Sequence, residues 1–236
     1  MGLAESRFLL AASILMASKQ RALGNMARSL YGPTPGRGPL TISEVYVGMM
    51  EEIKLRVKGL HQYYRGEATM AHGQIAREFC FLQLRMICEI MAIGCLLIHK
   101  HHSDVKQFEK LWHAGDVMDR LERLNPNFFP KAVTITRLPD TNFDCKDVTP
   151  APLTKKQFLT MYGKCGAQLH RGTIKEIATG IPASSIDLTD AHEMSNKIIE
   201  LLRVHRIASA DNKNHFFCRM ENGPPGSGVA MLTAKN

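Results

Sequence analysis

The sequence lacks the cysteine patterns of a disulfide framework or of a zinc-stabilised domain. None of its six cysteines forms a CxxC pair, and three of them lie inside one apolar run at 79–98. Cysteines placed in this way are typical of small core residues in a reducing compartment, so we expect a cytoplasmic protein. The four histidines between His99 and His113 have no carboxylate or cysteine at ligand spacing. We therefore predict no metal site, and no feature implies a cofactor.

Two further absences narrow the fold and the function. The chain has no internal repeat, which argues against a solenoid. The glycine-rich segment 222–228 is not followed by Lys-Ser/Thr and has no strand-to-helix context, so it is not a phosphate-binding loop.

Residues 1–40 are predicted to be a separable N-terminal extension. Its apolar stretch, Phe8–Ala17, is too short to span a bilayer and is followed by no persuasive cleavage site. Three interpretations are open: a dispensable or amphipathic helix, a targeting segment, or an extension outside the fold. The targeting segment is suggested because the stretch is poor in acids and contains Ser and Arg. The Pro/Gly-rich stretch Gly32–Pro39 indicates a linker.

The net charge of +8 is unevenly distributed. Residues 1–40 hold five basic and one acidic side chain, whereas the rest of the chain holds 25 basic and 21 acidic side chains. The body is therefore only mildly basic. This charge permits a groove that binds RNA but does not indicate one.

The body, 41–210, is predicted to be an all-α bundle of five helices. Apolar periodicity and capping residues favour helices over 41–60, with Ser43 as N-cap, and over 69–99 and 104–124. Two more are expected, one from a capping box at Thr154–Gln157 and one from Asp190, whose apolar face would include Leu201 and Ile207. A short extended piece is expected at 132–136. Residues 211–236 are predicted to form a small C-terminal hairpin, because the apolar runs 215–218 and 229–232 flank a Gly/Pro turn.

The apolar helix predicted over 69–99 contains charged side chains, which are costly to bury unless they are paired. Four polar side chains fall within a wedge of about 60° on an ideal helix: Gln74, Glu78, Arg85 and Glu89. A membrane span is disfavoured, because Arg85 and Glu89 would each cost about 2.5–3.5 kcal/mol in a bilayer. The wedge is either a narrow solvent stripe or a polar seam facing another helix. The i,i+4 pair alone is worth only a few tenths of a kcal/mol, so a buried seam needs partners on another element.

The segment Tyr162–Arg171 is the expected partner of that wedge. Gly163 and Gly166 lie on the same helix face as His170, and two glycines inside a helix cost about 1 kcal/mol each. Either another helix approaches closely here, or the helix ends early with Gly166 as its C-cap. His170 is either a structural histidine or a general acid–base group.

Four segments resemble a family of uncharacterised bacterial proteins over Thr41–Leu232: FLQLRMICEIMAIGCL, LERLNPNFFPKAV, LTKKQFLTMYGKCGAQLHRG and the LLRVHRIA-plus-hairpin region. That resemblance implies no activity. A weaker, fold-level likeness is to HEPN-type helical bundles, which are often dimeric and include metal-independent ribonucleases of toxin–antitoxin and antiviral systems. Their signature is Arg, four to six residues, then His. Here Cys165 stands where that Arg would be, with four residues between it and His170.

Three functions follow as hypotheses. The first is a HEPN-like, non-catalytic module of a bacterial defence or toxin–antitoxin system that binds RNA or a protein partner and is able to form a homodimer. The second is a metal-independent ribonuclease in which His170 is catalytic, Arg85 or Lys164 contacts the phosphate, and Glu89 orients Arg85. The third is an assembly module without an active site. The predicted binding residues are Tyr162, Lys164, Arg171 and Glu78.

Overall fold

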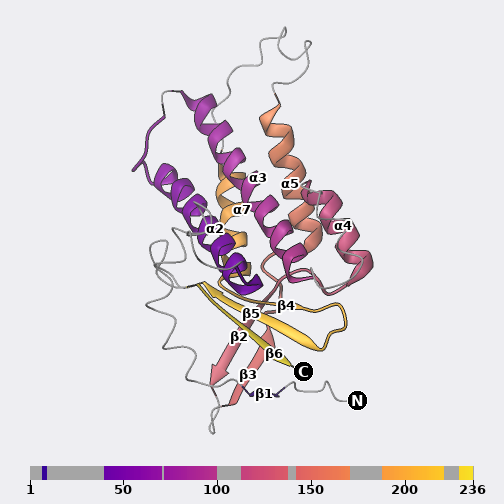
Figure 1. Cartoon of the computed structure of the whole chain (residues 1–236). Helices are drawn as coiled ribbons and strands as arrows, with labels where there is room; N and C mark the ends of the chain where they lie inside the picture. Colours follow the sequence, from indigo (N-terminus) through magenta and orange to yellow (C-terminus); the bar gives the residue numbers. More distant parts are fainter. Residues whose placement is uncertain are drawn as a thin grey trace.

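The structure, a computed structural model, describes residues 7–9, 40–70, 72–99, 113–137, 142–170, 188–220 and 229–235. Within these ranges the chain forms five helices and six strands (Figure 1). The helices are α2 (Ile42–Tyr64), α3 (Gly73–Ile98), α4 (Ala114–Leu124), α5 (Lys155–Leu169) and α7 (Thr189–Leu202). The strands are β1 (Arg7–Leu9), β2 (Lys131–Arg137), β3 (Asn142–Asp147), β4 (Val204–Ala208), β5 (Asn214–Met220) and β6 (Val229–Lys235).

The prediction of an all-α bundle is wrong, because the six strands form one antiparallel sheet. Their order is β1-β3-β2-β4-β5-β6. The predicted pairing of the two C-terminal runs is observed, with Phe217 opposite Leu232. These runs are the last two strands of the sheet rather than an appendage to helices. The extended piece expected at 132–136 is β2, which pairs with both β3 and β4.

Strand β4 was missed because the predicted fifth helix extended beyond the end of α7. Ile207 was expected to continue the apolar face of that helix, but α7 ends at Leu202 and β4 follows almost at once. In β4 the side chains alternate: His205 and Ile207 are buried, whereas Arg206 is partly exposed. That period of two belongs to a strand.

Capping boxes in the sequence fix where α2 and α5 begin. The capping box predicted at Thr154 is confirmed, since its hydroxyl accepts from the Gln157 amide while the Gln157 side chain accepts from the Thr154 amide. The first long helix is capped by Thr41 rather than by the expected Ser43. Glu44 completes a second capping box there. Each box satisfies backbone donors that would otherwise lack partners.

The helices lie together on one side of the sheet (Figure 1). Helices α2 and α7 contact the strands, and α3 contacts α2, α4, α5 and α7. One large core joins these layers and includes Leu84 from α3, Leu201 from α7 and Ile207 from β4. A smaller cluster around Val133 and Phe217 lies on the opposite face of the sheet. Strands β1 and β6 end the strand order and also contact each other, so the sheet curls around this second cluster.

Helix α3 is long and apolar enough to cross a membrane by length and composition. In this fold, however, 61% of its most apolar 18-residue window is buried against the rest of the protein. The prediction of one helix over 104–124 is wrong, because α4 begins at Ala114 after an extended N-cap, His113. Residues 104–112 and most of the N-terminal extension lie outside the described residues, and Arg7–Leu9 of that extension is β1 of the sheet.

Candidate functional site

Arg85, Glu89 and Tyr162 form a closed hydrogen-bonded network between α3 and α5, here called the polar seam. Arg85 Nε donates to Glu89 Oε1 at 3.1 Å. The Tyr162 hydroxyl donates to the same Glu89 oxygen at 3.1 Å, and it accepts from Arg85 Nη2 at 3.3 Å. The Arg85 guanidinium also lies over the Tyr162 ring, 5.1 Å from its centroid. The partner that the weak i,i+4 pair required is therefore Tyr162.

Gly166 explains why α5 is able to approach this network. The helix continues past Gly166 to Leu169, so the alternative in which Gly166 is a C-cap is wrong. A Cβ at Gly166 would lie 3.2 Å from Arg85 Nη1, a distance tighter than most real contacts. A Cβ at Gly163 would meet nothing within 4 Å. Close approach therefore accounts for Gly166 and not for Gly163.

Tyr162 and Cys165 are uncharged near neutral pH, whereas Arg85 and Glu89 form an ion pair. Burial and the neighbouring Glu89 carboxylate raise the pKa of Tyr162, although Arg85 opposes this effect. Tyr162 therefore remains a protonated donor near neutral pH. Behind it, burial raises the pKa of the Cys165 thiol to about 12. Cys165 is thus a packed, protonated thiol rather than a nucleophile.

The other predicted site residues do not join the seam. His170 is the exposed C-cap of α5, and within the described part of the chain no hydrogen bond or ion pair links it to Arg85. Lys164 is paired with Asp190 of α7 at 3.1 Å, also on the surface. Glu78 accepts a hydrogen bond from Gln74 on its own helix. Arg171 lies outside the described residues.

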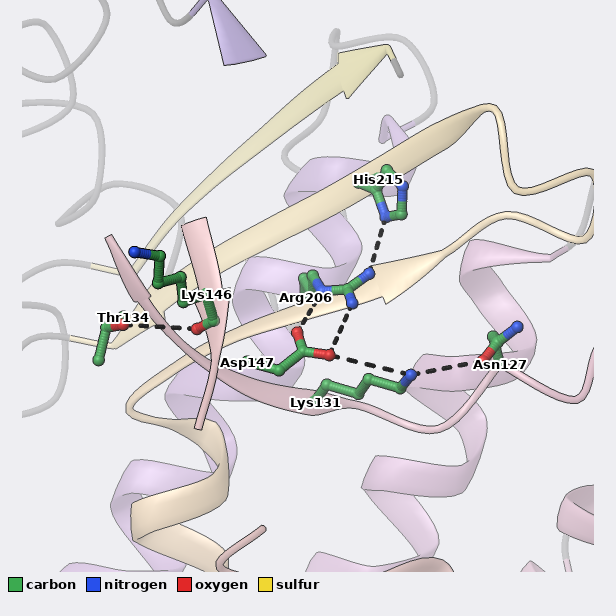
Figure 2. Close-up of polar contacts among 7 residues, drawn as sticks. All are labelled: Asn127, Lys131, Thr134, Lys146, Asp147, Arg206 and His215. Atoms are coloured by element: carbon green, nitrogen blue, oxygen red, sulfur yellow. Dashed lines mark hydrogen bonds and ion pairs between the residues drawn. The ribbon is translucent and has the colours of Figure 1, made fainter. Parts of the chain in front are cut away.

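A second polar cluster, on the sheet, was missed by the sequence interpretation (Figure 2). Arg206 of β4 makes a bidentate pair with Asp147 of β3, with both N···O distances at 2.8 Å. Its remaining Nη1 lies 3.2 Å from His215 Nδ1 on β5. Lys131 lies 4.0 Å from the Asp147 carboxylate. Four strands thus contribute to one network, here called the sheet cluster.

The chemistry of the sheet cluster favours a structural role. A guanidinium only donates hydrogen bonds, so the neutral His215 ring accepts at Nδ1 and carries its proton on Nε2. Burial and the charge of Arg206 lower the pKa of His215. Burial would raise the pKa of Asp147, but the hydrogen bonds and charge of Arg206, with Lys131 and His215 nearby, lower it overall. Residues 204–208 read Val-His-Arg-Ile-Ala, with no alternation of apolar and polar side chains, so no local sequence signal marked this cluster.

His205 is the second histidine with a defined proton position. Its Nδ1 lies 2.9 Å from the Leu202 carbonyl oxygen, which can only accept, so Nδ1 carries the proton. Its Nε2 therefore accepts from the Tyr46 hydroxyl at 2.7 Å. Burial lowers the pKa of His205 to about 4. This pair ties α2 to β4 inside the core and is closed to substrate.

Comparison with protein-family models, with curated proteins and with solved structures found no match for this chain. Within the ranges that the structure describes, no three His, Cys, Asp or Glu side chains are grouped so as to hold a metal ion.

Proposed function

We propose that this chain is an assembly module without an active site, and that it binds a protein through the exposed face of α3. The observation that carries the proposal is the exposure of Ile75 and Leu82, at 52% and 44%, on one side of that helix. They lie seven residues apart, almost two full turns, so they share a face. The partly buried Phe79 and Met86 flank them. These four residues are here called the α3 outer face.

The α3 outer face places two exposed apolar side chains close together on one helix. Outside β1 and β6, three large hydrophobic side chains are exposed in the described ranges, and two of them are on α3. Single exposed apolar residues need no explanation, but neighbouring ones on a rigid helix are typical of an interaction site. The third, Ile135, lies on β2 of the sheet.

Several contacts support an assembly module over a ribonuclease. The Arg85 guanidinium, the cation that a His170-dependent reaction would need, lies between α3 and α5 in contact with Glu89 and Tyr162. His170 lies at the exposed end of α5, and among the described residues no hydrogen bond or ion pair joins it to Arg85. Stabilising the charge of a phosphodiester transition state requires donors aimed at the phosphate. Cys165 stands at the position of the missing signature arginine and is buried. The polar seam therefore supports helix packing better than it supports chemistry.

The pairing of surface cations supports a protein partner over RNA. Lys164 pairs with Asp190, Lys146 with Asp144, and Arg206 with Asp147. Cations held beside carboxylates contribute less to the positive field that attracts a phosphate backbone. The bacterial defence or toxin–antitoxin setting is part of this proposal on the strength of the sequence resemblance alone.

Site-specific photo-cross-linking tests the proposal. A photoreactive residue replaces Leu82 in one variant and Lys156, an exposed residue of α5, in the matched control. Irradiation of the expressing cells should give a discrete protein adduct from position 82 and none from position 156. An adduct that contains RNA, or no adduct from either position, would contradict the proposed function.

A further inference from the structure

We infer that the partner of the α3 outer face is a second copy of this chain, with the two α3 helices antiparallel and the two-fold axis near Leu82. This inference rests on the proposed function and names the occupant of the same surface. A two-fold interface uses one patch twice, so the patch has to be complementary to itself. The α3 outer face meets that condition.

The charges beside Leu82 fit an antiparallel pair. Glu78 and Arg85 lie seven residues apart on the same side of α3, almost symmetrically about Leu82. In an antiparallel pair centred there, Glu78 of one copy lies opposite Arg85 of the other. The two-fold axis repeats this contact, giving two ion pairs. In a parallel pair the two-fold axis runs along the helices and carries these side chains to opposite flanks of the interface, so neither ion pair forms.

The two side chains are placed to make these contacts. Glu78 is partly exposed and accepts from Gln74, so its carboxylate is held on the helix surface. The Arg85 side chain is 25% exposed, and its guanidinium has five N–H donors, of which Glu89 and Tyr162 accept two. The polar seam therefore holds Arg85 in a fixed position next to the apolar patch.

The apolar residues follow the same symmetry. Leu82 lies near the axis and meets Leu82 of the second copy. Ile75 of one copy comes within about one helical turn of Met86 of the other, because each residue advances about 1.5 Å along the axis. Pairing the two outer faces would remove both exposed side chains, Ile75 and Leu82, from water in each copy.

Sedimentation equilibrium of the full chain gives the first test. The wild type should be a dimer, and Leu82→Asp should be a monomer because it buries two carboxylates at the axis. Ile135→Asp is the matched control, since it also adds a carboxylate at an exposed apolar residue, and it should remain a dimer. Circular dichroism confirms that each variant is folded. A monomeric wild type, or a dimer that survives Leu82→Asp, would overturn the inference.

Engineered cysteines give the geometric test. Under mild oxidation Leu82→Cys should form a disulfide-linked dimer. Ile75→Cys should not, because in the antiparallel pair the two copies of residue 75 lie about 21 Å apart along the axis. Cross-linking through both cysteines would indicate a parallel pair, and cross-linking through neither would place the interface elsewhere. Both results contradict the inference.

The photo-cross-linking experiment separates this inference from the function on which it rests. A monomer whose position-82 adduct contains a different protein overturns the self-pairing and leaves the proposed function standing. A monomer that gives no protein adduct from position 82 overturns both the self-pairing and the proposed function.

Discussion

Gly166 of α5 lies against the guanidinium group of Arg85 on α3, so closely that a Cβ at Gly166 would be 3.2 Å from Arg85 Nη1. Arg85 cannot easily move away, because Glu89 and Tyr162 both bind it. The absence of a side chain at Gly166 thus permits the polar seam to form. The seam in turn fixes α5 beside the outer face of α3.

The two glycines of α5 should respond differently to the same substitution. Gly163→Ala should stabilise the protein by roughly 1 kcal/mol through helix propensity, since its Cβ would enter open space. Gly166→Ala should fail to stabilise it, because the new methyl group displaces Arg85. Denaturant unfolding measures both changes. An equal gain in the two variants would show that Arg85 does not constrain Gly166. In an Arg85→Ala background the difference between the two glycines should disappear.

The Tyr162 hydroxyl should contribute measurably to stability. Tyr162→Phe removes the group that joins Arg85 to Glu89 across the two helices, so we expect a loss of about 1 kcal/mol in unfolding free energy. Tyr63→Phe on α2 serves as the control for loss of a phenol and should change stability by less. If the two variants are equally stable, the seam is not a structural link between α3 and α5.

His205 should make the protein less stable in acid. Its pKa is about 4 in the fold and near the ordinary 6.5 when unfolded, so the unfolded chain binds a proton that the native state refuses. Its contribution is complete above pH 6.5 and is lost as the pH falls from there toward 4. An NMR titration should place the midpoint of the His205 ring resonances near 4. A midpoint near 6.5 would mean that burial does not hold the ring neutral.

His170 should be dispensable. Because this exposed cap makes no hydrogen bond or ion pair with Arg85 among the described residues, His170→Ala should leave growth on expression unchanged from the wild type. RNA incubated with either purified protein should be degraded to the same extent. Toxicity or RNA cleavage that disappears in His170→Ala would restore the ribonuclease hypothesis and contradict the assembly module.

The sequence predicted the seam better than the fold. Helical period and capping residues locate α2, α3 and α5, and the cost of ions in an apolar run correctly called for a partner such as Tyr162. Those signals act within one element or between two long helices. The prediction also placed His170 near the seam, but the helix ends just before it, and its side chain lies at the surface.

The sheet was not predicted because its signals are short and non-local. Strand β4 has only five residues and follows α7 directly, so Ile207 fitted a helical period as well as a strand. Pairing of Lys131 with Arg206 joins β2 to β4, which are far apart in the chain. Periodicity within a window cannot report such contacts. The bidentate bond from Arg206 to Asp147 depends entirely on that pairing.

The mass of the protein in solution, with and without a carboxylate at position 82, is the most direct test of the assembly module. We expect a dimeric wild type, a folded monomeric Leu82→Asp variant and a dimeric Ile135→Asp control. A wild type that remains monomeric at every concentration, and gives no protein adduct from position 82, would contradict it.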